Sequence, residues 1–215
     1  MQWFCLISPL RYPAAMHISA SAIICAVRPH GEAGAVVRVM TAEYGLLAGY
    51  VRGGRSRTMR PVLQPSNIVR AEFRARVETQ LPGLTVELEH SRGPLMAEPL
   101  AAAALDWATA LTASVVPELH PYPTVHSALD GLLIAIEAAP AARGWAGALV
   151  SYEALILSAL GFGHGDGGRP DDWPDVLASL NQSGARLDRY LFSDRRADVL
   201  AARERLVERL KRAAA

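Results

Sequence analysis

Hydrophobic and polar residues alternate along short runs between residues 18 and 92, the period of half-buried β-strands. The clearest run is 68–76, where one parity holds Val69, Ala71, Phe73 and Ala75 and the other holds Arg70, Glu72, Arg74 and Arg76. Turn residues separate the runs and predict five strands, over 20–27, 33–41, 46–52, 68–77 and 84–89. Five short strands joined by turns favour a small closed barrel of the oligonucleotide-binding (OB) type over a doubly wound sheet.

Beyond residue 92 the hydrophobic residues recur at steps of three and four, which is the period of amphipathic helices. Three such stripes are Leu100, Ala104, Trp107, Leu111 and Val115; Leu129, Leu132, Leu133 and Ile136; and Trp145, Leu149, Tyr152, Ile156 and Leu160. A last helix is expected from about residue 194, with its basic residues, Arg203 among them, on a solvated face that could add weakly to an anion-binding surface. The predicted fold class is therefore α+β, an N-terminal five-stranded OB-type β-barrel followed by an all-α helical domain.

The composition changes near Ser91–Pro94, which divides the chain into a barrel domain over 18–92 and a helical domain over 93–215. Residues 1–17 are expected to be a disordered or mis-assigned leader. Their apolar start lacks a basic segment and is broken by prolines, so it makes a poor signal peptide and is too short to cross a bilayer. No membrane contact is expected, and a cytoplasmic location follows by default.

The formal net charge of +1 hides a strong asymmetry along the chain. Residues 28–76 hold nine arginines against three acidic residues, a net charge of +6, whereas residues 77–188 carry a net charge of −10. Such a division favours one region for phosphates and another for proteins, although a solvated charged face is the simpler alternative.

A glycine-arginine loop, Gly53 to Arg60, concentrates the basic charge. Its two glycines let the backbone turn and approach a ligand closely, so the loop arginines can contact a polyanion. The predicted DNA-binding residues are Arg52, Arg55, Arg57 and Arg60 in the loop, Arg74 and Arg76 extending the track, and Tyr50 as a stacking residue. The alternative for Tyr50 is a half-buried core position.

Motifs of known enzymes are missing from the sequence: it has no GxxxxGK[ST], HExxH or GxSxG pattern. Its two cysteines form no CxxC pair, so neither a disulfide framework nor a four-ligand zinc site is expected, and no cofactor is predicted. The segment His164–Asp172 holds one histidine and three carboxylates. It could bind a divalent ion, or it could be a glycine-rich turn before a helix whose first acids interact with the helix dipole.

Five short segments follow one another along the chain: His30-Gly31-Glu32, Thr41 to Leu46, Val51 to Arg55, Leu63-Gln64-Pro65, and Tyr152-Glu153 through Leu160 to Gly163. The same segments occur in this order in the bacterial RecO family of recombination mediators. The chain resembles this family over residues 18–163, and its last helix matches more loosely. In many members a four-cysteine zinc element follows the Leu-Gly-Phe-Gly segment, whereas this chain has no cysteine there and would be a zinc-free, shortened form.

The resemblance implies an OB barrel, a helical C-terminal domain, and binding and annealing of DNA, single-stranded and double-stranded. It also implies partnership with RecR and with the C-terminal tail of the single-stranded-DNA-binding protein, and help in loading RecA. For the acidic, apolar-ended tail we expect a site at Arg143, Trp145 and Leu149, where a cation stands next to apolar residues. Two other functions stay open: an adaptor that binds only proteins, and a metal-dependent hydrolase built on His164 and Asp166.

Overall fold

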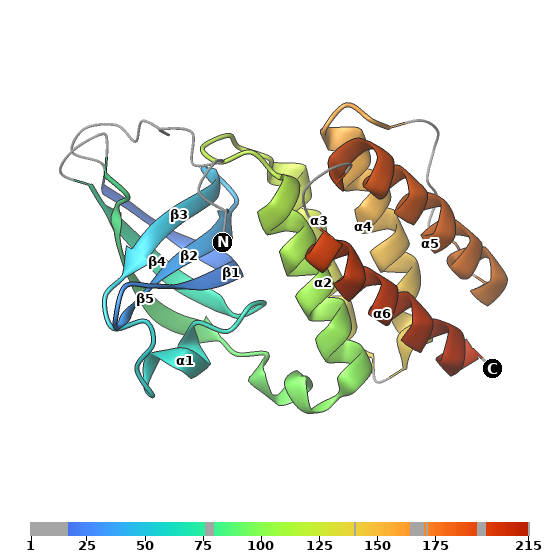
Figure 1. The fold of residues 1–215 in the computed structure, drawn as a ribbon, viewed down its shortest axis with the longest axis horizontal. Coiled ribbons are helices and arrows are strands. Elements are labelled where there is room, and N and C mark those ends of the chain that lie inside the picture. Colours follow the sequence, from blue (N-terminus) through green and yellow to red (C-terminus); the bar gives the residue numbers. More distant parts are fainter. Residues whose placement is uncertain are drawn as a thin grey trace. The chain divides into compact units, whose positions relative to one another are not determined.

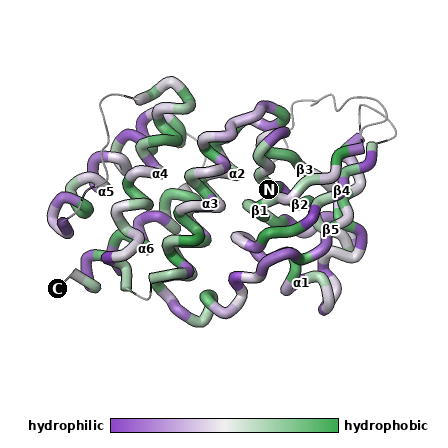
Figure 2. The backbone as a smooth tube through the Cα atoms, turned by 180° about the vertical axis from the view of Figure 1, so that it is seen from behind, coloured by the Kyte–Doolittle hydropathy of each residue, from purple (hydrophilic) through white to green (hydrophobic). Residues whose placement is uncertain are grey.

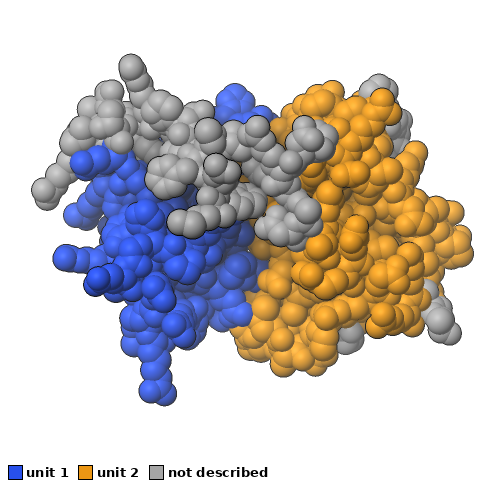
Figure 3. All heavy atoms as spheres, in the orientation of Figure 1, with its two compact units in different colours: residues 1–91, 117–122 blue, residues 92–116, 123–215 orange. Residues whose placement is uncertain are grey.

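The computed structural model describes residues 17–75, 80–139, 141–163, 170, 172–192 and 197–214 (Figure 1). The chain forms two compact units, coloured separately in Figure 3. Unit 1 ends at Ser91 but also includes Pro117–Tyr122, and unit 2 holds Arg92–Val116 and the chain from Pro123 onward. The chain therefore returns to the first unit for six residues after its first long helix, which periodicity alone does not indicate.

Unit 1 is a closed five-stranded β-barrel with the strand order β1-β2-β3-β5-β4. Its strands are β1 (His17–His30), β2 (Gly34–Thr41), β3 (Gly45–Val51), β4 (Ile68–Arg74) and β5 (Gly83–His90), with the short helix α1 (Met59–Val62) between β3 and β4. All pairs are antiparallel except β3 with β5, which closes the barrel in parallel at Tyr50 and Gly83. The predicted fold class is confirmed.

The long first strand β1 serves two neighbours, because its start pairs with β4 and its end with β2. An irregularity between Ile24 and Ala26 lets the strand bend from one partner to the other. Beyond it, β1 and β2 continue as a hairpin that ends at the pair His30 and Gly34. We call the end of this hairpin, residues 28–36, the hairpin end, because the candidate site is built on it.

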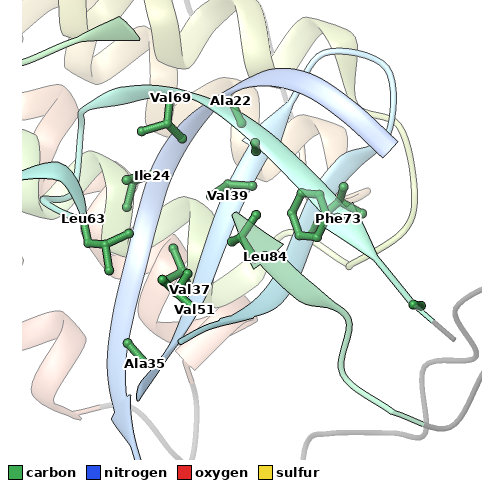
Figure 4. Packing of buried hydrophobic residues seen from close by; sticks show 13 residues of the cluster. Ala22, Ile24, Ala35, Val37, Val39, Val51, Leu63, Val69, Phe73 and Leu84 are labelled. Carbon is green, nitrogen blue, oxygen red and sulfur yellow. The ribbon is translucent and has the colours of Figure 1, made fainter. Parts of the chain in front are cut away.

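The barrel core is formed by the inward parity of each strand (Figure 4). Its buried members are Ala22, Ile24, Ala35, Val37, Val39, Leu47, Val51, Leu63, Val69, Ala71, Phe73, Ala75 and Leu84. The four residues assigned to the core parity of the 68–76 run are all among them. Gly49 is needed where β3 passes the centre, because a Cβ there would lie 2.6 Å from Leu84 Cβ and 2.9 Å from Phe73 Cε1.

The segment Pro117–Tyr122 covers the edge of β3 that β5 does not reach. Leu46 bridges to Glu118 in parallel, Leu119 N donates to Leu46 O at 3.0 Å, and Arg38 forms an ion pair with Glu118. Gly45, at φ 70°, packs so closely on the His120 carbonyl that a side chain would overlap it. These contacts satisfy backbone groups of β3 that would otherwise form an open sheet edge.

Unit 2 consists of helices (Figures 1 and 2). They are the 3-10 turn η1 (Gly93–Ala97), α2 (Pro99–Val115), α3 (Pro123–Ala138), the 3-10 turn η2 (Ala142–Gly144), α4 (Ala146–Ala159), α5 (Trp173–Leu187), the π-helical turn η3 (Asp188–Phe192) and α6 (Ala197–Ala214). The predicted stripes supply the buried faces of α2, α3 and α4. In α5 and α6, hydrophilic and hydrophobic residues alternate along the tube of Figure 2, as in amphipathic helices.

Two helix boundaries follow from local sequence. Helix α4 ends at Ala159, and Gly161 follows its C-cap with a φ of 87° that suits glycine. Phe162 N donates to Leu157 O at 2.8 Å, which gives a Schellman-type end. Helix α5 begins after Asp172, whose carboxylate accepts from Asp175 N at 2.8 Å. The interpretation of this segment as a helix start is thus supported at Asp172, while residues 164–169 and 171 lie outside the described residues.

A buried ion pair joins four helices of unit 2. Glu153 of α4 is fully buried and accepts hydrogen bonds at 2.8 Å from Arg203 of α6, through Nε and Nη2, and from Trp107 Nε1 of α2. Ser183 of α5 donates to the same carboxylate. The expectation that Arg203 lies on a solvated face was wrong, because its guanidinium is the counter-charge of a carboxylate that has no access to water.

Candidate nucleic-acid interface

The loop after β3 folds back against the turn of the β1–β2 hairpin. Gly53 takes a φ of 67°, Gly54 N donates to Val51 O at 3.3 Å, and Arg55 N donates to Ala33 O at 3.0 Å. A Cβ on Gly54 would lie 2.8 Å from Ala35 Cβ, so only glycine lets the loop approach β2 this closely. The two glycines therefore have distinct roles: Gly53 turns the chain, and Gly54 docks it on the hairpin end.

All four loop arginines are exposed, but they are held differently. Arg55 Nη1 donates to Glu32 O at 3.0 Å, and Arg60 Nε donates to Arg55 O at 3.1 Å. Within the described part of the chain, the side chains of Arg52 and Arg57 form no hydrogen bond or ion pair. Two cations are thus pre-positioned against the hairpin end, and two project from the loop into solvent.

Tyr50 of β3 lies beside the outer face of the hairpin end. In the strand register, Arg28 lies opposite Val36, and Val36 lies opposite Tyr50, so all three point away from the barrel core. The half-buried Tyr50 ring covers Gly34, where a side chain would overlap it, and meets the ring of His30 edge-on at 6.0 Å. Tyr50 is thus half-buried, as the alternative expects, and the register turns its ring away from the barrel core.

Arg55 and Arg60, from the loop after β3, lie against the inner face of the same hairpin end. They line a hollow of about 280 Å³ together with Val27, Pro29, Ala35 and Gly54. Val27 and Pro29 share the parity of Val37 and Ala35, which point toward the barrel core. The predicted stacking residue and two of the predicted phosphate-binding arginines therefore lie on opposite faces of one hairpin.

Arg74 lies at the end of β4, two strands away from Tyr50. It pairs with Gly83 of β5, and Gly83 in turn pairs with Tyr50 of β3. Its side chain is 72% exposed and lies 3.4 Å from Glu72 Oε2, a surface ion pair that a phosphate can replace at small cost. Arg76, the other residue predicted to extend the track, lies outside the described residues.

Two candidate residues were missed by the sequence reasoning, Arg28 and His30. Both are exposed on the outer face of the hairpin end, and His30 contacts Tyr50. The sequence signal was the turn after His30, since a hairpin turn at Gly31 sets His30 opposite Gly34 and therefore beside any ring that covers Gly34. Arg28 adds a cation next to the ring pair.

The predicted tail-binding residues divide between surface and core. Arg143, in η2, is exposed, and its guanidinium lies 5.3 Å from the centroid of the Trp173 ring. Trp145 and Leu149 are 2% and 0% exposed, so they support the start of α4 from inside. Trp173 is 8% exposed, and its Nε1 is buried without a hydrogen-bond partner in the described chain.

Metal and thiol chemistry have little support in the described residues. No group of three or more His, Cys, Asp or Glu side chains is placed there to hold a metal ion. Burial raises the pKa of the Cys25 thiol to about 12, so this thiol stays protonated and is a poor ligand or nucleophile. His164 and Asp166, the basis of the hydrolase hypothesis, lie outside the described residues. Among the described helices, none is both long and apolar enough to cross a membrane.

Comparison with known proteins finds one family and a set of relatives. Residues 16–92 match the family described as "Recombination protein O N terminal". A protein named DNA repair protein RecO from Rhodospirillum centenum is 32% identical over 244 residues, covering 92% of this chain and 96% of that protein. Proteins of the same name from Gluconacetobacter diazotrophicus and Rhodospirillum rubrum are 38% and 42% identical over 69% and 66% of this chain. These two alignments span only 59% and 57% of the relatives' own length.

Proposed function

The chain belongs to the RecO family of DNA repair proteins, and we propose that it acts in DNA repair and recombination as a mediator without enzymatic activity. In this role it binds single-stranded and double-stranded DNA, anneals complementary strands and, with RecR, helps to load RecA. Such work places it with the nucleoid in the cytoplasm.

One observation carries the proposal: four exposed arginines, one before and three after a pair of glycines, belong to a turn that docks on the hairpin end of an OB-type barrel. Guanidinium groups bind phosphate oxygens in a fixed, often bidentate geometry. Arg52, Arg55, Arg57 and Arg60 contact successive phosphates, and Arg74 with Arg76 extends the track. Such contacts position a strand without reading its bases, which is what annealing of arbitrary sequences requires.

The outer face of the hairpin end adds a stacking surface to this track. Tyr50 offers a ring held in place by Gly34 and His30, and Arg28 supplies a cation beside it. Aromatic rings bind bases of any identity, because every base has a π-face. Tyr50 therefore favours single strands, whose bases are free to stack on it.

Binding of single-stranded DNA at several salt concentrations tests the proposal. We expect the logarithm of affinity to fall linearly with the logarithm of salt concentration, and annealing of complementary strands to be faster with the protein than without it. An adaptor that binds only proteins would show neither effect. A divalent-ion-dependent product formed from DNA would instead favour the hydrolase.

We further propose that the C-terminal tail of the single-stranded-DNA-binding protein binds at Arg143. The exposed guanidinium lies over the ring of Trp173, whose buried indole N–H has no acceptor among the described residues. A terminal carboxylate can accept from the guanidinium, and the apolar end of the tail contacts the indole ring. In this proposal, Trp145 and Leu149 do not contact the tail. They support the start of α4 from the core.

Changing Arg143 to glutamate is expected to weaken binding of the tail peptide more than tenfold, or by about 1.4 kcal/mol or more, because an attraction is replaced by a repulsion. Fluorescence anisotropy of a labelled tail peptide measures the effect. Arg143→Lys keeps the charge and should lose less affinity. DNA affinity should stay nearly constant in both variants. Tail binding that survives the change to glutamate, or a parallel loss of DNA binding, contradicts the separate tail site.

A further inference from the structure

We propose that the hollow on the inner face of the hairpin end holds one unpaired nucleobase of a bound DNA strand. The inference rests on the proposed DNA binding and deepens it, because it assigns a base-binding subsite beside the phosphate track. Two features of the hollow support this inference: its apolar walls and the two arginines at its border.

The walls come from three separate segments of the barrel unit. Val27 and Pro29 belong to β1, Ala35 belongs to β2, and Gly54 belongs to the loop after β3. Arg55 and Arg60 complete the lining and supply the charges that the described residues give it. The hollow is thus apolar at its walls and cationic at its border, with a volume of about 280 Å³.

The geometry of the hollow is set before any ligand arrives. Strand pairing fixes Pro29 opposite Ala35, and Arg55 N holds the loop to Ala33 O at 3.0 Å. The guanidinium of Arg60 is held by Arg55 O at 3.1 Å. A ligand that enters does not have to order these groups, so less of its binding free energy is lost.

A nucleotide of a single strand matches this combination better than a simple anion does. Its base has a flat apolar face that packs on the walls and that a guanidinium plane can stack upon, while its phosphate reaches the cationic border. An inorganic phosphate would use the arginines and leave the apolar walls exposed to water. A base in a duplex is paired and stacked, and entering the hollow would require it to flip out. The hollow therefore favours single strands over duplexes.

The first experiment compares two single-stranded oligonucleotides of equal length, one of them abasic throughout. Both carry the same phosphates, so the salt dependence of binding should be similar, but the protein should bind the intact strand about tenfold more tightly. Equal affinities for the two strands would overturn the base-binding hollow while leaving the phosphate track intact. Absence of DNA binding altogether would overturn both the hollow and the proposed function.

The second experiment fills the hollow to separate it from Tyr50, which also contacts bases in our proposal. Val27→Leu and Pro29→Leu each add apolar volume to the walls without changing charge. We expect the preference for the intact strand to fall from about tenfold to about threefold or less in each variant, with duplex affinity unchanged. An unchanged preference in both variants would refute the hollow as a base site.

Val86→Leu is the matched control, because it adds the same group to another strand of the same barrel, away from the hollow. Its preference for the intact strand should equal that of the unmodified protein. Thermal unfolding of all three variants checks the fold, and Pro29 is exposed, so its replacement disturbs packing least. The comparison of intact and abasic strands uses the unmodified protein and stands even if a variant unfolds.

Discussion

Replacing Arg203 with leucine is expected to lower the free energy of unfolding of the helical unit by about 3–5 kcal/mol. The variant leaves the Glu153 carboxylate fully buried without its counter-charge. Trp107 Nε1 and Ser183 Oγ still donate to it, but neutral donors do not compensate a buried charge. The four helices that meet at this carboxylate should therefore loosen together.

Urea denaturation followed by tryptophan fluorescence measures the loss of stability in the helical unit. Trp107, Trp145 and Trp173 all lie in unit 2, while Trp3 lies outside the described residues. Arg205→Leu is the matched control, since Arg205 is exposed on the same helix and its loss should change stability by no more than about 0.5 kcal/mol. Similar midpoints for the two variants would show that the buried pair contributes little.

The pair can also be removed as a whole. Replacing Glu153 and Arg203 with leucine together should recover much of the stability lost by Arg203→Leu, because no unpaired charge remains. A double variant as unstable as the single one would indicate that the loss comes from altered packing rather than from the unpaired carboxylate.

Replacing Arg52, Arg55, Arg57 and Arg60 with alanine should flatten the slope of log affinity against log salt by about 3 on single-stranded DNA. Each arginine that neutralises a phosphate releases condensed counterions, so losing four contacts removes four contributions to the slope. The loss should be similar for unrelated DNA sequences, because no base edge is read by these residues. Titrations at four or more salt concentrations give the slope directly.

A variant with all four arginines changed to lysine is the matched control for charge. Lysine keeps the cation but cannot reproduce the fork geometry, so we expect the slope to be kept while the affinity falls modestly. Since the four side chains are exposed, neither variant should unfold at a much lower temperature. A slope that stays unchanged in the alanine variant would remove these arginines from the DNA contact.

The hydrophobic period of the sequence predicted burial correctly where burial depends on the local geometry of a strand or helix. The parity of the run 68–76 placed Val69, Ala71 and Phe73 in the core, and all three are fully buried. The stripe through Leu149 and Ile156 likewise became the buried face of α4. Neighbouring side chains point to opposite faces of a strand, and residues three and four apart share a face of a helix. Burial of one face therefore follows from the order of residues alone.

The hydrophobic period could not predict contacts between residues that are far apart in the sequence. Glu153 and Arg203 are 50 positions apart, and each, taken alone, resembles an ordinary solvated charge. The same limit applies to Pro117–Tyr122, which follow a helix of unit 2 yet complete the barrel. Trp145 was predicted both as part of a helical stripe and as part of a tail-binding pocket, and only its burial separates the two roles.

The amino-acid order by itself determined the five strands, the helical stripes, the change of composition near Ser91 and the loop that gathers the arginines. Tertiary structure alone decided that Tyr50 and Arg55 lie on opposite faces of one hairpin and that His30 joins Tyr50. It also decided which charge is buried. The reason is physical: backbone geometry imposes a period on near neighbours, whereas contacts between distant segments depend on how strands register and helices pack.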